Sequence, residues 1–290
     1  EIEKGDHILY VLKTLKSHGV IISKGYDIKI KSEIFINAGI SSSSALIVAL
    51  INFFLKIYVP EKVSAKYISE LAYESEVLQQ GGSGGKMDQY SISNGNTIFL
   101  ETGVNNNFKK IKSPFKNFII ANSGVKKHTD EILFKLKIKT LDAIKNICNH
   151  YPTLKLCEIK ENQVNDFREL IDEKSFKYFK AAIVNHSITL DALSELKKDK
   201  PDLIKLGKLM IKHHNVLKNK LRLTVPKIDR MIDLAKKNGA YGYKIIGSGG
   251  GGSILILAEN KFQEKIISDL KKIGVNEIVK SNESPGILDL

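Results

Sequence analysis

The sequence has few cysteines and no long apolar run. Cys148 and Cys157 are its two cysteines, too few and too widely spaced for a disulfide framework or a zinc site, so we expect two reduced thiols. Neither Leu46–Leu55 nor Ile245–Ala258 supplies the roughly 20 uninterrupted apolar residues that a membrane helix needs. The first residues, from Glu1 on, lack the charged, apolar and small segments of a secretory signal. These absences predict a soluble, cytoplasmic protein.

Arginine is also scarce, although the net charge is +13. The positive charge comes almost entirely from dispersed lysine, with arginine only at Arg168, Arg222 and Arg230. Because recognition of nucleic acid favours bidentate contacts from arginine, we expect no nucleic-acid partner. Dispersed lysine is typical of a solvated surface, and the positive field still favours a small polyanion such as a nucleotide.

The apolar pattern predicts a mixed α and β order over a chain of 290 residues with 42% hydrophobic content. The predicted strands are 26–34, 98–100, 118–121, 243–246 and 254–257. The predicted helices are 45–58, 63–80, 136–147, 203–217, 227–238 and 262–272. We place one domain boundary in the polar stretch before Phe118, which gives domains 1–116 and 117–290.

A run of serines joins the first predicted strand to the first predicted helix. The segment is Gly39-Ile40-Ser41-Ser42-Ser43-Ser44. Free backbone N–H groups, small hydroxyls and the positive end of a helix dipole meet at such a point, which suits a phosphate group. A helix cap with surplus serines explains the segment about equally well, and the preceding strand favours the phosphate loop.

Two acidic residues flank a glycine-rich turn further along the chain. Glu76 lies near the end of a predicted helix, and Asp88 follows the turn Gly81–Gly85. Paired carboxylates beside a phosphate loop suit Mg²⁺ binding and the orientation or deprotonation of an attacking hydroxyl. The alternative is two surface acids around a flexible loop.

A second glycine-rich segment, Gly247–Gly252, lies between two predicted strands. Glycine forgoes side-chain packing and loses extra entropy on folding, so this run indicates close backbone approach to a ligand or a neighbouring loop. A flexible hairpin turn is the alternative, although such a turn needs fewer glycines.

Together these segments resemble the GHMP kinase superfamily, which includes galactokinase and the homoserine, mevalonate and phosphomevalonate kinases. Gly39–Leu46 is similar to the family's second motif and Gly247–Gly252 to its third. Gly85–Gln89 is similar to the Gly-Ile-Met-Asp-Gln segment of galactokinases, and Glu76 lies twelve residues before Asp88, where those enzymes carry a metal-binding glutamate.

The resemblance implies an α+β, two-domain GHMP kinase architecture, with an N-terminal ATP-binding domain like domain 2 of a ribosomal protein and a ferredoxin-like C-terminal domain. It implies ATP and Mg²⁺ as cofactors, with Ser43 and Glu76 as metal ligands and Asp88 as the catalytic residue facing a sugar hydroxyl. The expected acceptor is the 1-hydroxyl of galactose. The residues implied in ATP binding are Gly39, Ile40, Ser41, Ser42, Ser43, Ser44, Gly249, Gly250 and Gly251.

Other positions leave the acceptor open. Lys86 and Gly250 stand where galactokinases carry Ile and Phe and favour heptose- or mevalonate-kinase patterns, so heptose, fucose and mevalonate remain alternatives, as does a non-catalytic sugar sensor. Tyr90, Lys126 and His128 are weaker candidates for lining a sugar pocket. For the adjacent His213 and His214 we expect structural or surface roles, because neighbours on a helix cannot face the same point.

The family's first motif, an Arg-containing strand followed by Gly-Glu-His-Thr-Asp in galactokinases, does not occur in the sequence, which also lacks an initiator methionine. Residues 1–20 resemble the helix that follows this motif. We therefore expect that the sequence is a fragment.

Overall fold

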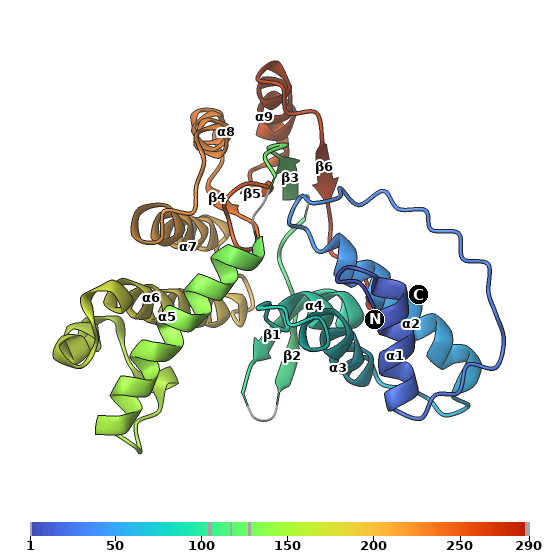
Figure 1. Cartoon of the computed structure of the whole chain (residues 1–290). Coiled ribbons are helices and arrows are strands. Elements are labelled where there is room, and N and C mark those ends of the chain that lie inside the picture. Colours follow the sequence, from blue (N-terminus) through green and yellow to red (C-terminus); the bar gives the residue numbers. More distant parts are fainter. Residues whose placement is uncertain (1, 104–105, 117, 127–128, 288–290) are drawn as a thin grey trace. The chain divides into compact units, whose positions relative to one another are not determined.

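The structure is a computed structural model that describes residues 2–103, 106–116, 118–126 and 129–287, with the backbone alone described at 129–133. The chain folds as two compact units (Figure 1). The first unit is Glu1–Ile36, Ile40–Ser113 and Glu283–Leu290, and the second is Asn37–Gly39 and Pro114–Asn282. That 1–116 is the ATP-binding domain and 117–290 the C-terminal kinase domain stays a prediction.

The first unit is mainly helical. Its elements are α1 (His7–Ser17), α2 (Ser42–Tyr58), α3 (Ala65–Tyr73), a π-helical turn (Glu74–Leu78), α4 (Met87–Asn94) and the antiparallel strands β1 (Thr97–Glu101) and β2 (Asn107–Ile111). Apolar residues recur on one face of α1 and α3, and α2 is apolar over most of its surface, so the three helices bury a common core. The fully buried residues of this core include Leu15 of α1, Ile47 and Ile51 of α2, and Ile68 of α3.

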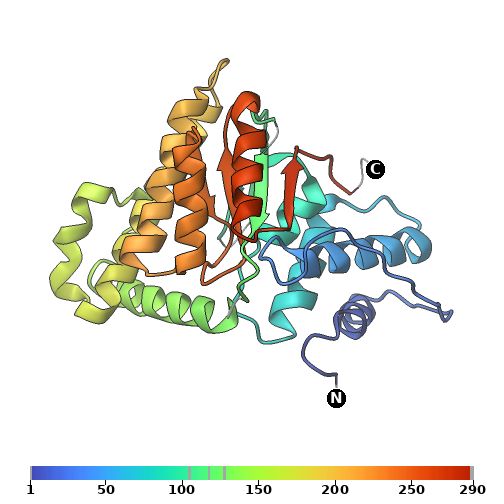
Figure 2. The same cartoon turned by 90° about the horizontal axis from the view of Figure 1, so that it is seen from above.

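The second unit is built on an antiparallel sheet with strand order β4-β5-β3-β6 among the described residues. These strands are β3 (Phe118–Asn122), β4 (Gly242–Ile245), β5 (Ser253–Leu257) and β6 (Ile278–Ser281). Helices α8 (Pro226–Lys237) and α9 (Asn260–Lys272), orange and red in Figure 2, bury their apolar faces against this sheet. Ile119, Ile256 and Ile266 have no exposed surface in this core.

Three long helices complete the second unit. They are α5 (Thr129–His150), α6 (Glu173–Leu196) and α7 (Leu203–Asn215), with short 3₁₀ segments at Leu156–Glu158 and Glu161–Leu170 and a π-helical turn at Val216–Lys220. A smaller core lies between α5, α6 and the second 3₁₀ segment, where Ile147, Phe179 and Val164 are buried.

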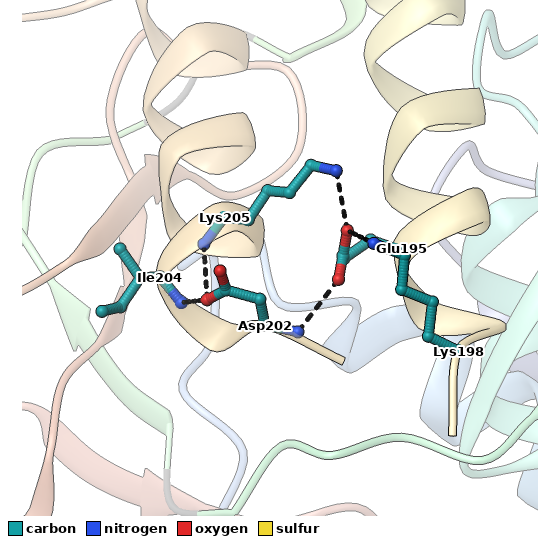
Figure 3. A network of polar contacts seen from close by, with 5 residues as sticks. All are labelled: Glu195, Lys198, Asp202, Ile204 and Lys205. Carbon is teal, nitrogen blue, oxygen red and sulfur yellow. Dashed lines mark hydrogen bonds and ion pairs between the residues drawn. The ribbon is translucent and has the colours of Figure 1, made fainter. Parts of the chain in front are cut away.

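The connection from α6 to α7 is held by the buried side chain of Glu195 (Figure 3). Its carboxylate accepts a hydrogen bond from the backbone N–H of Asp202 at 3.0 Å and pairs with Lys198 and Lys205, each at 2.8 Å. The Asp202 side chain in turn caps α7 by accepting from the N–H groups of Ile204 and Lys205. One carboxylate thus fixes the turn between two helices.

The predicted strand at 26–34 is wrong. Residues 20–41, all described, include no strand, and Ile28, Ile30 and Ile34 are 40%, 52% and 38% exposed. Alternating apolar residues form a strand only where a neighbouring backbone completes the hydrogen-bond ladder, and no neighbour does so among the residues described. The serine loop is therefore not preceded by a strand among the described residues.

The other predicted elements are confirmed. Strands at 98–100, 118–121, 243–246 and 254–257 fall within β1, β3, β4 and β5 or overlap them. The predicted helices correspond to α2, α3 with its π-turn, α5, α7 with its π-turn, α8 and α9. The described helices include none that combines the length and the apolar character that crossing a membrane requires.

Candidate active site

Helix α2 begins on the serine run without a side-chain cap, although serine is a residue that commonly supplies one. Its N-cap residue Ser41 has the left-handed backbone angles φ 64° and ψ 38°, and in the described part of the chain its hydroxyl makes no capping hydrogen bond. Helices α4, α8 and α9 also begin without a side-chain cap, but none of them has Ser, Thr, Asp or Asn as its N-cap residue. By contrast, where the N-cap is Asp or Ser, in α1, α3, α6 and α7 (Asp6, Ser64, Asp172 and Asp202), its side chain accepts from an N–H group of the first turn. The surplus-cap explanation of the serine run is therefore disfavoured, and the first turn of α2 keeps N–H groups available for an external acceptor.

The hydroxyl of Ser43, in the first turn of α2, donates to Glu76 Oε1 at 2.6 Å. The other carboxylate oxygen, Oε2, accepts from Gln89 Nε2, also at 2.6 Å. Three elements that are distant in sequence thus meet at one carboxylate: α2, the π-turn and α4. Gln89, which is 2% exposed, is not among the site residues that the sequence predicts.

Glu76 lies within the π-helical turn Glu74–Leu78, whose wider winding is marked by the hydrogen bond from Gln79 N–H to Glu74 O at 2.9 Å. Such single π-turns occur often at functional sites. Glu74, two residues earlier, pairs with His18 Nε2 at 2.9 Å, so the two carboxylates of this turn have different partners. The sequence carries no signal that would have predicted the π-turn.

Asp88 lies in the first turn of α4, next in sequence to the Gln89 that binds Glu76. The positive end of the helix dipole favours an ionised carboxylate there. Asp88 is partly exposed, as a residue that meets a small substrate must be.

Tyr90 fixes α4 to α3. It is fully buried, donates its hydroxyl hydrogen to Glu70 Oε1 at 3.1 Å, and meets Phe108 edge to face. Burial, followed by the hydrogen bond to the Glu70 carboxylate, raises the pKa of Tyr90 to about 12. Tyr90 therefore has a structural role in this structure and does not face a pocket, unlike the expectation from sequence.

The pair Ser43 and Glu76 fits a magnesium ion that is shared with a bound phosphate. Octahedral Mg²⁺ with oxygen ligands at about 2.1 Å puts neighbouring ligands about 3.0 Å apart, so the two oxygens, now 2.6 Å apart, would need to separate only slightly. No three His, Cys, Asp or Glu side chains among the described residues gather as a protein-only metal site requires. Mg²⁺ commonly takes one or two protein oxygens and completes its shell with water and substrate phosphates, so two ligands suffice.

The glycine loop of the second unit packs closely against neighbouring backbone. A Cβ on Gly249, where φ is +78°, would lie 2.6 Å from Leu223 O, and one on Gly251, where φ is +138°, would lie 2.6 Å from Val125 O. Gly250 N–H donates to Leu223 O at 2.8 Å, which ties the loop to the segment before α8. The prediction of close approach to a neighbouring loop is confirmed, whereas the predicted role of 249–251 in ATP binding stays a prediction.

The remaining candidates lie in the second unit. Lys126 is exposed beside the glycine loop, and His128 lies outside the described residues. His214 is buried with its ring edge to face against Tyr243, and burial lowers its pKa to about 4. Burial also lowers the pKa of His213 to about 4. The packing of His214 confirms the expected structural role.

The structure therefore brings part of the predicted site together. Ser41–Ser44, Glu76 and Asp88 belong to the first unit, and in it Ser43 and Glu76 are in contact through a hydrogen bond. Gly39 and Gly249–Gly251 are counted with the second unit. That both sets bind one nucleotide stays a prediction.

Comparison with known families identifies the class of protein. Residues 6–96 match the model of the GHMP kinases N terminal domain, and residues 190–276 match that of the GHMP kinases C terminal domain. The two matches together span more than half of the chain and include the serine loop, Glu76, Asp88 and the glycine loop. The chain belongs to the GHMP kinases, which are phosphotransferases that use ATP and act on hydroxyl groups.

The relatives similar in sequence include both a mevalonate kinase and galactokinases. A mevalonate kinase of Methanocaldococcus jannaschii is 28% identical over 255 residues, covering 87% of this chain and 67% of that protein. A galactokinase of Fusobacterium nucleatum is 26% identical over 272 residues, covering 90% of this chain and 69% of that protein. Sequence similarity alone thus leaves the acceptor open.

Solved structures support the two-domain fold. The galactokinase of Lactococcus lactis complexed with galactose superposes with a TM-score of 0.83 at 22% identity, over 99% of this chain and 77% of that one. The mevalonate kinase of Methanococcus jannaschii gives a TM-score of 0.65 at 26% identity, over 95% and 75%. The expected α+β architecture of a GHMP kinase is confirmed.

Proposed function

We propose that this protein is an ATP-dependent sugar kinase that transfers the γ-phosphoryl group to the 1-hydroxyl of galactose. The observation that carries the proposal is the Ser43–Glu76 contact at 2.6 Å, at the start of a helix whose first turn has no side-chain cap. A phosphate acceptor and a divalent cation both suit that position.

In the proposed reaction, the bond between the γ-phosphorus and the bridging β-phosphate oxygen breaks, and a bond forms from phosphorus to the acceptor oxygen. Asp88 takes up or orients the proton that the acceptor hydroxyl loses. Backbone N–H groups of residues 40–44 in the first unit would hold the phosphates, and for Gly39 and Gly249–Gly251 in the second unit we propose ATP binding as a separate point. Catalysis then consists mainly of positioning and electrostatic stabilisation, as is general for phosphoryl transfer.

Ser43 and Glu76 would hold Mg²⁺, which when bound neutralises charge on the phosphate oxygens. Gln89 positions the Glu76 carboxylate by occupying its second oxygen at 2.6 Å. Glu76 thereby presents Oε1 toward Ser43. The same contact restricts rotation of the carboxylate about the last side-chain bond of Glu76.

The segment Met87-Asp88-Gln89 and several galactokinase relatives at 24–27% identity support galactose as the acceptor. A mevalonate acceptor is the second candidate, supported by the 28% identical mevalonate kinase and by Lys86 and Gly250. Heptose and fucose remain further alternatives within the same chemistry.

The test is an acceptor panel on the protein with its full natural chain, measured as ATP consumption with and without Mg²⁺. We expect galactose to give the highest kcat/KM and removal of Mg²⁺ to abolish turnover. A kcat/KM at least about tenfold higher for mevalonate, a difference of about 1.4 kcal/mol in transition-state stabilisation, would reassign the acceptor. Binding of ATP and galactose without turnover would instead indicate a sugar sensor.

A further inference from the structure

The last described residues of the chain belong to the first unit and lie on the end of α4. We call Glu283–Ile287 the tail segment. The backbone O of Ser284 accepts from Asn96 N–H at 2.7 Å, and Ile287 N–H donates to Ser93 O at 3.1 Å. An isolated β-bridge pairs Gly95 with Pro285. Backbone contacts thus attach the tail segment to the C-terminal end of α4.

Two glycines make this contact unusually close. A Cβ on Gly95, where φ is +65°, would lie 2.1 Å from Gly286 N, and one on Gly286 would lie 2.6 Å from Asn94 O and 2.7 Å from Ser93 O. Real Cβ atoms do not approach backbone atoms so closely, so any side chain at either position must displace the tail segment or α4. The fit therefore restricts where α4 lies relative to the tail segment.

Helix α4 also carries the residues of the proposed site. It has eight residues, too few to be stable alone, so its position depends on packing, through Tyr90 against α3 and through its C-terminal end against the tail segment. Gln89 lies one turn before Ser93 on the same face, because residues four apart are neighbours on a helix. Displacement of Ser93 by the tail segment would therefore displace Gln89 as well.

Among the described residues, the side chain of Gln89 has no second hydrogen bond that could absorb such a displacement. Its Nε2 donates to Glu76, whereas its buried Oε1 and the buried hydroxyl of Ser93 have no hydrogen-bond partner in the described part of the chain. The orientation of the amide is thus determined by the α4 backbone on one side and the Glu76 carboxylate on the other.

We propose that the tail segment is a positioning element of the phosphoryl-transfer site. It holds α4 so that Gln89 orients Glu76 toward Ser43 and Asp88 keeps its place. This inference rests on the proposed kinase function and adds residues at the opposite end of the sequence to the same site.

The test is Gly286→Ala in the full-length protein, with Gly25→Ala as the matched control. Both glycines have ordinary φ angles, but a Cβ on Gly25 would meet nothing within 4 Å. We expect Gly286→Ala to lower kcat by about tenfold or more with little change in acceptor KM, since misplacement by about 1 Å can cost about 10²-fold. Gly25→Ala should keep wild-type kcat. Unchanged kcat in folded Gly286→Ala would overturn the proposal.

A double-mutant cycle separates positioning from general loss of stability. If the tail segment acts through Gln89, then Gly286→Ala should slow the Gln89→Ala enzyme much less than it slows the wild type. If the double variant instead loses kcat by the product of the two single losses, the tail segment does not act through Gln89. If Gly286→Ala does not fold, Ile287→Ala, which loosens the partly buried end of the tail segment, replaces it in the same cycle.

Failure of the proposed function gives a different result. In that case the wild-type protein turns over no acceptor. The affinity of the wild type and of both glycine variants for a non-hydrolysable ATP analogue is then measured with and without Mg²⁺. Weaker Mg²⁺-dependent affinity in Gly286→Ala than in Gly25→Ala supports the positioning role without any turnover. Equal Mg²⁺-dependent affinities, or a wild-type affinity that does not depend on Mg²⁺, would overturn it.

Discussion

At the scale of single residues, Glu76 shows how one carboxylate acquires a defined orientation. Ser43 and Gln89 each bind one of its oxygens, both at 2.6 Å. Glu74, in the same π-turn, instead pairs with His18. Two acids separated by one residue thus serve different parts of the structure, which makes them a matched pair for mutagenesis.

We expect Glu76→Gln to abolish most Mg²⁺-dependent turnover, because an amide keeps the shape of the side chain but loses the charge that binds the cation. Loss of one well-placed charge stabiliser typically costs about 10²–10³ in kcat. The control Glu74→Gln removes the partner of His18 and should change kcat by less than about twofold, as expected for an exposed ion pair. Titration of Mg²⁺ in a steady-state assay measures both effects, and equal losses in the two variants would remove the proposed role of Glu76.

Asp88→Asn should lower kcat by about 10²–10³ with little change in the affinity for ATP, because Asn keeps the hydrogen-bonding shape but cannot accept a proton. Single-turnover kinetics at saturating ATP isolate the chemical step. Near-normal turnover in this variant would contradict the catalytic assignment of Asp88.

At the scale of elements, buried polar side chains determine how neighbouring helices meet. Glu195 is the clearest case, since its side chain is 1% exposed and joins the end of α6 to the start of α7 (Figure 3). Hydrogen bonds from Lys198, Lys205 and the backbone of Asp202 lower the pKa of Glu195 from 4.5 to about 2. The carboxylate is therefore more acidic in the folded protein than in the unfolded chain.

This shift predicts a pH dependence of stability. A depressed carboxylate pKa stabilises the folded state fully above about pH 4.5, and this contribution is lost as the pH falls toward about 2. Glu195→Gln should lower Tm by several degrees at pH 7, and the difference from the wild type should shrink below about pH 4. Thermal melts from pH 7 to about pH 2 measure this difference in Tm. Glu158→Gln, which replaces an exposed acidic residue, is the control. A difference that does not change with pH would show that packing, rather than ionisation, is responsible.

At the scale of the whole molecule, each of the two units has a large hydrophobic core of its own. One lies around Ile47 and Leu15, and the other around the sheet with Ile119 and Ile256. The net charge of +13 surrounds both with a positive field that favours the approach of a nucleotide and weakens with salt. Ligand binding to the folded state then raises the stability of the protein by mass action.

A non-hydrolysable ATP analogue with Mg²⁺ should therefore raise Tm. At a ligand concentration of 100 times Kd the expected stabilisation is about 2.7 kcal/mol. Ser43→Ala should remove the Mg²⁺-dependent part of this shift. The control Ser64→Ala removes the cap of α3, so it should lower Tm but keep the full shift. An undiminished Mg²⁺-dependent shift in Ser43→Ala would contradict its assignment as a metal ligand.

The sequence by itself was sufficient for the family and most elements. The serine run, the spacing of Glu76 and Asp88 and the second glycine run are local patterns that the backbone chemistry of phosphate binding explains. Helices such as α8 and α9 could be predicted because their apolar period is set by residues close in sequence. The 24-residue helix α6 was not predicted, since its polar and apolar residues give a weaker pattern.

Only the tertiary structure decided the rest. A strand needs a partner backbone, which a sequence pattern does not supply, and so 26–34 was wrongly predicted. The roles of Gln89, of the π-turn and of the tail segment depend on residues 13 to about 190 positions apart that meet in space. Such contacts have no local sequence signal, because the interacting atoms become neighbours only when the chain has packed.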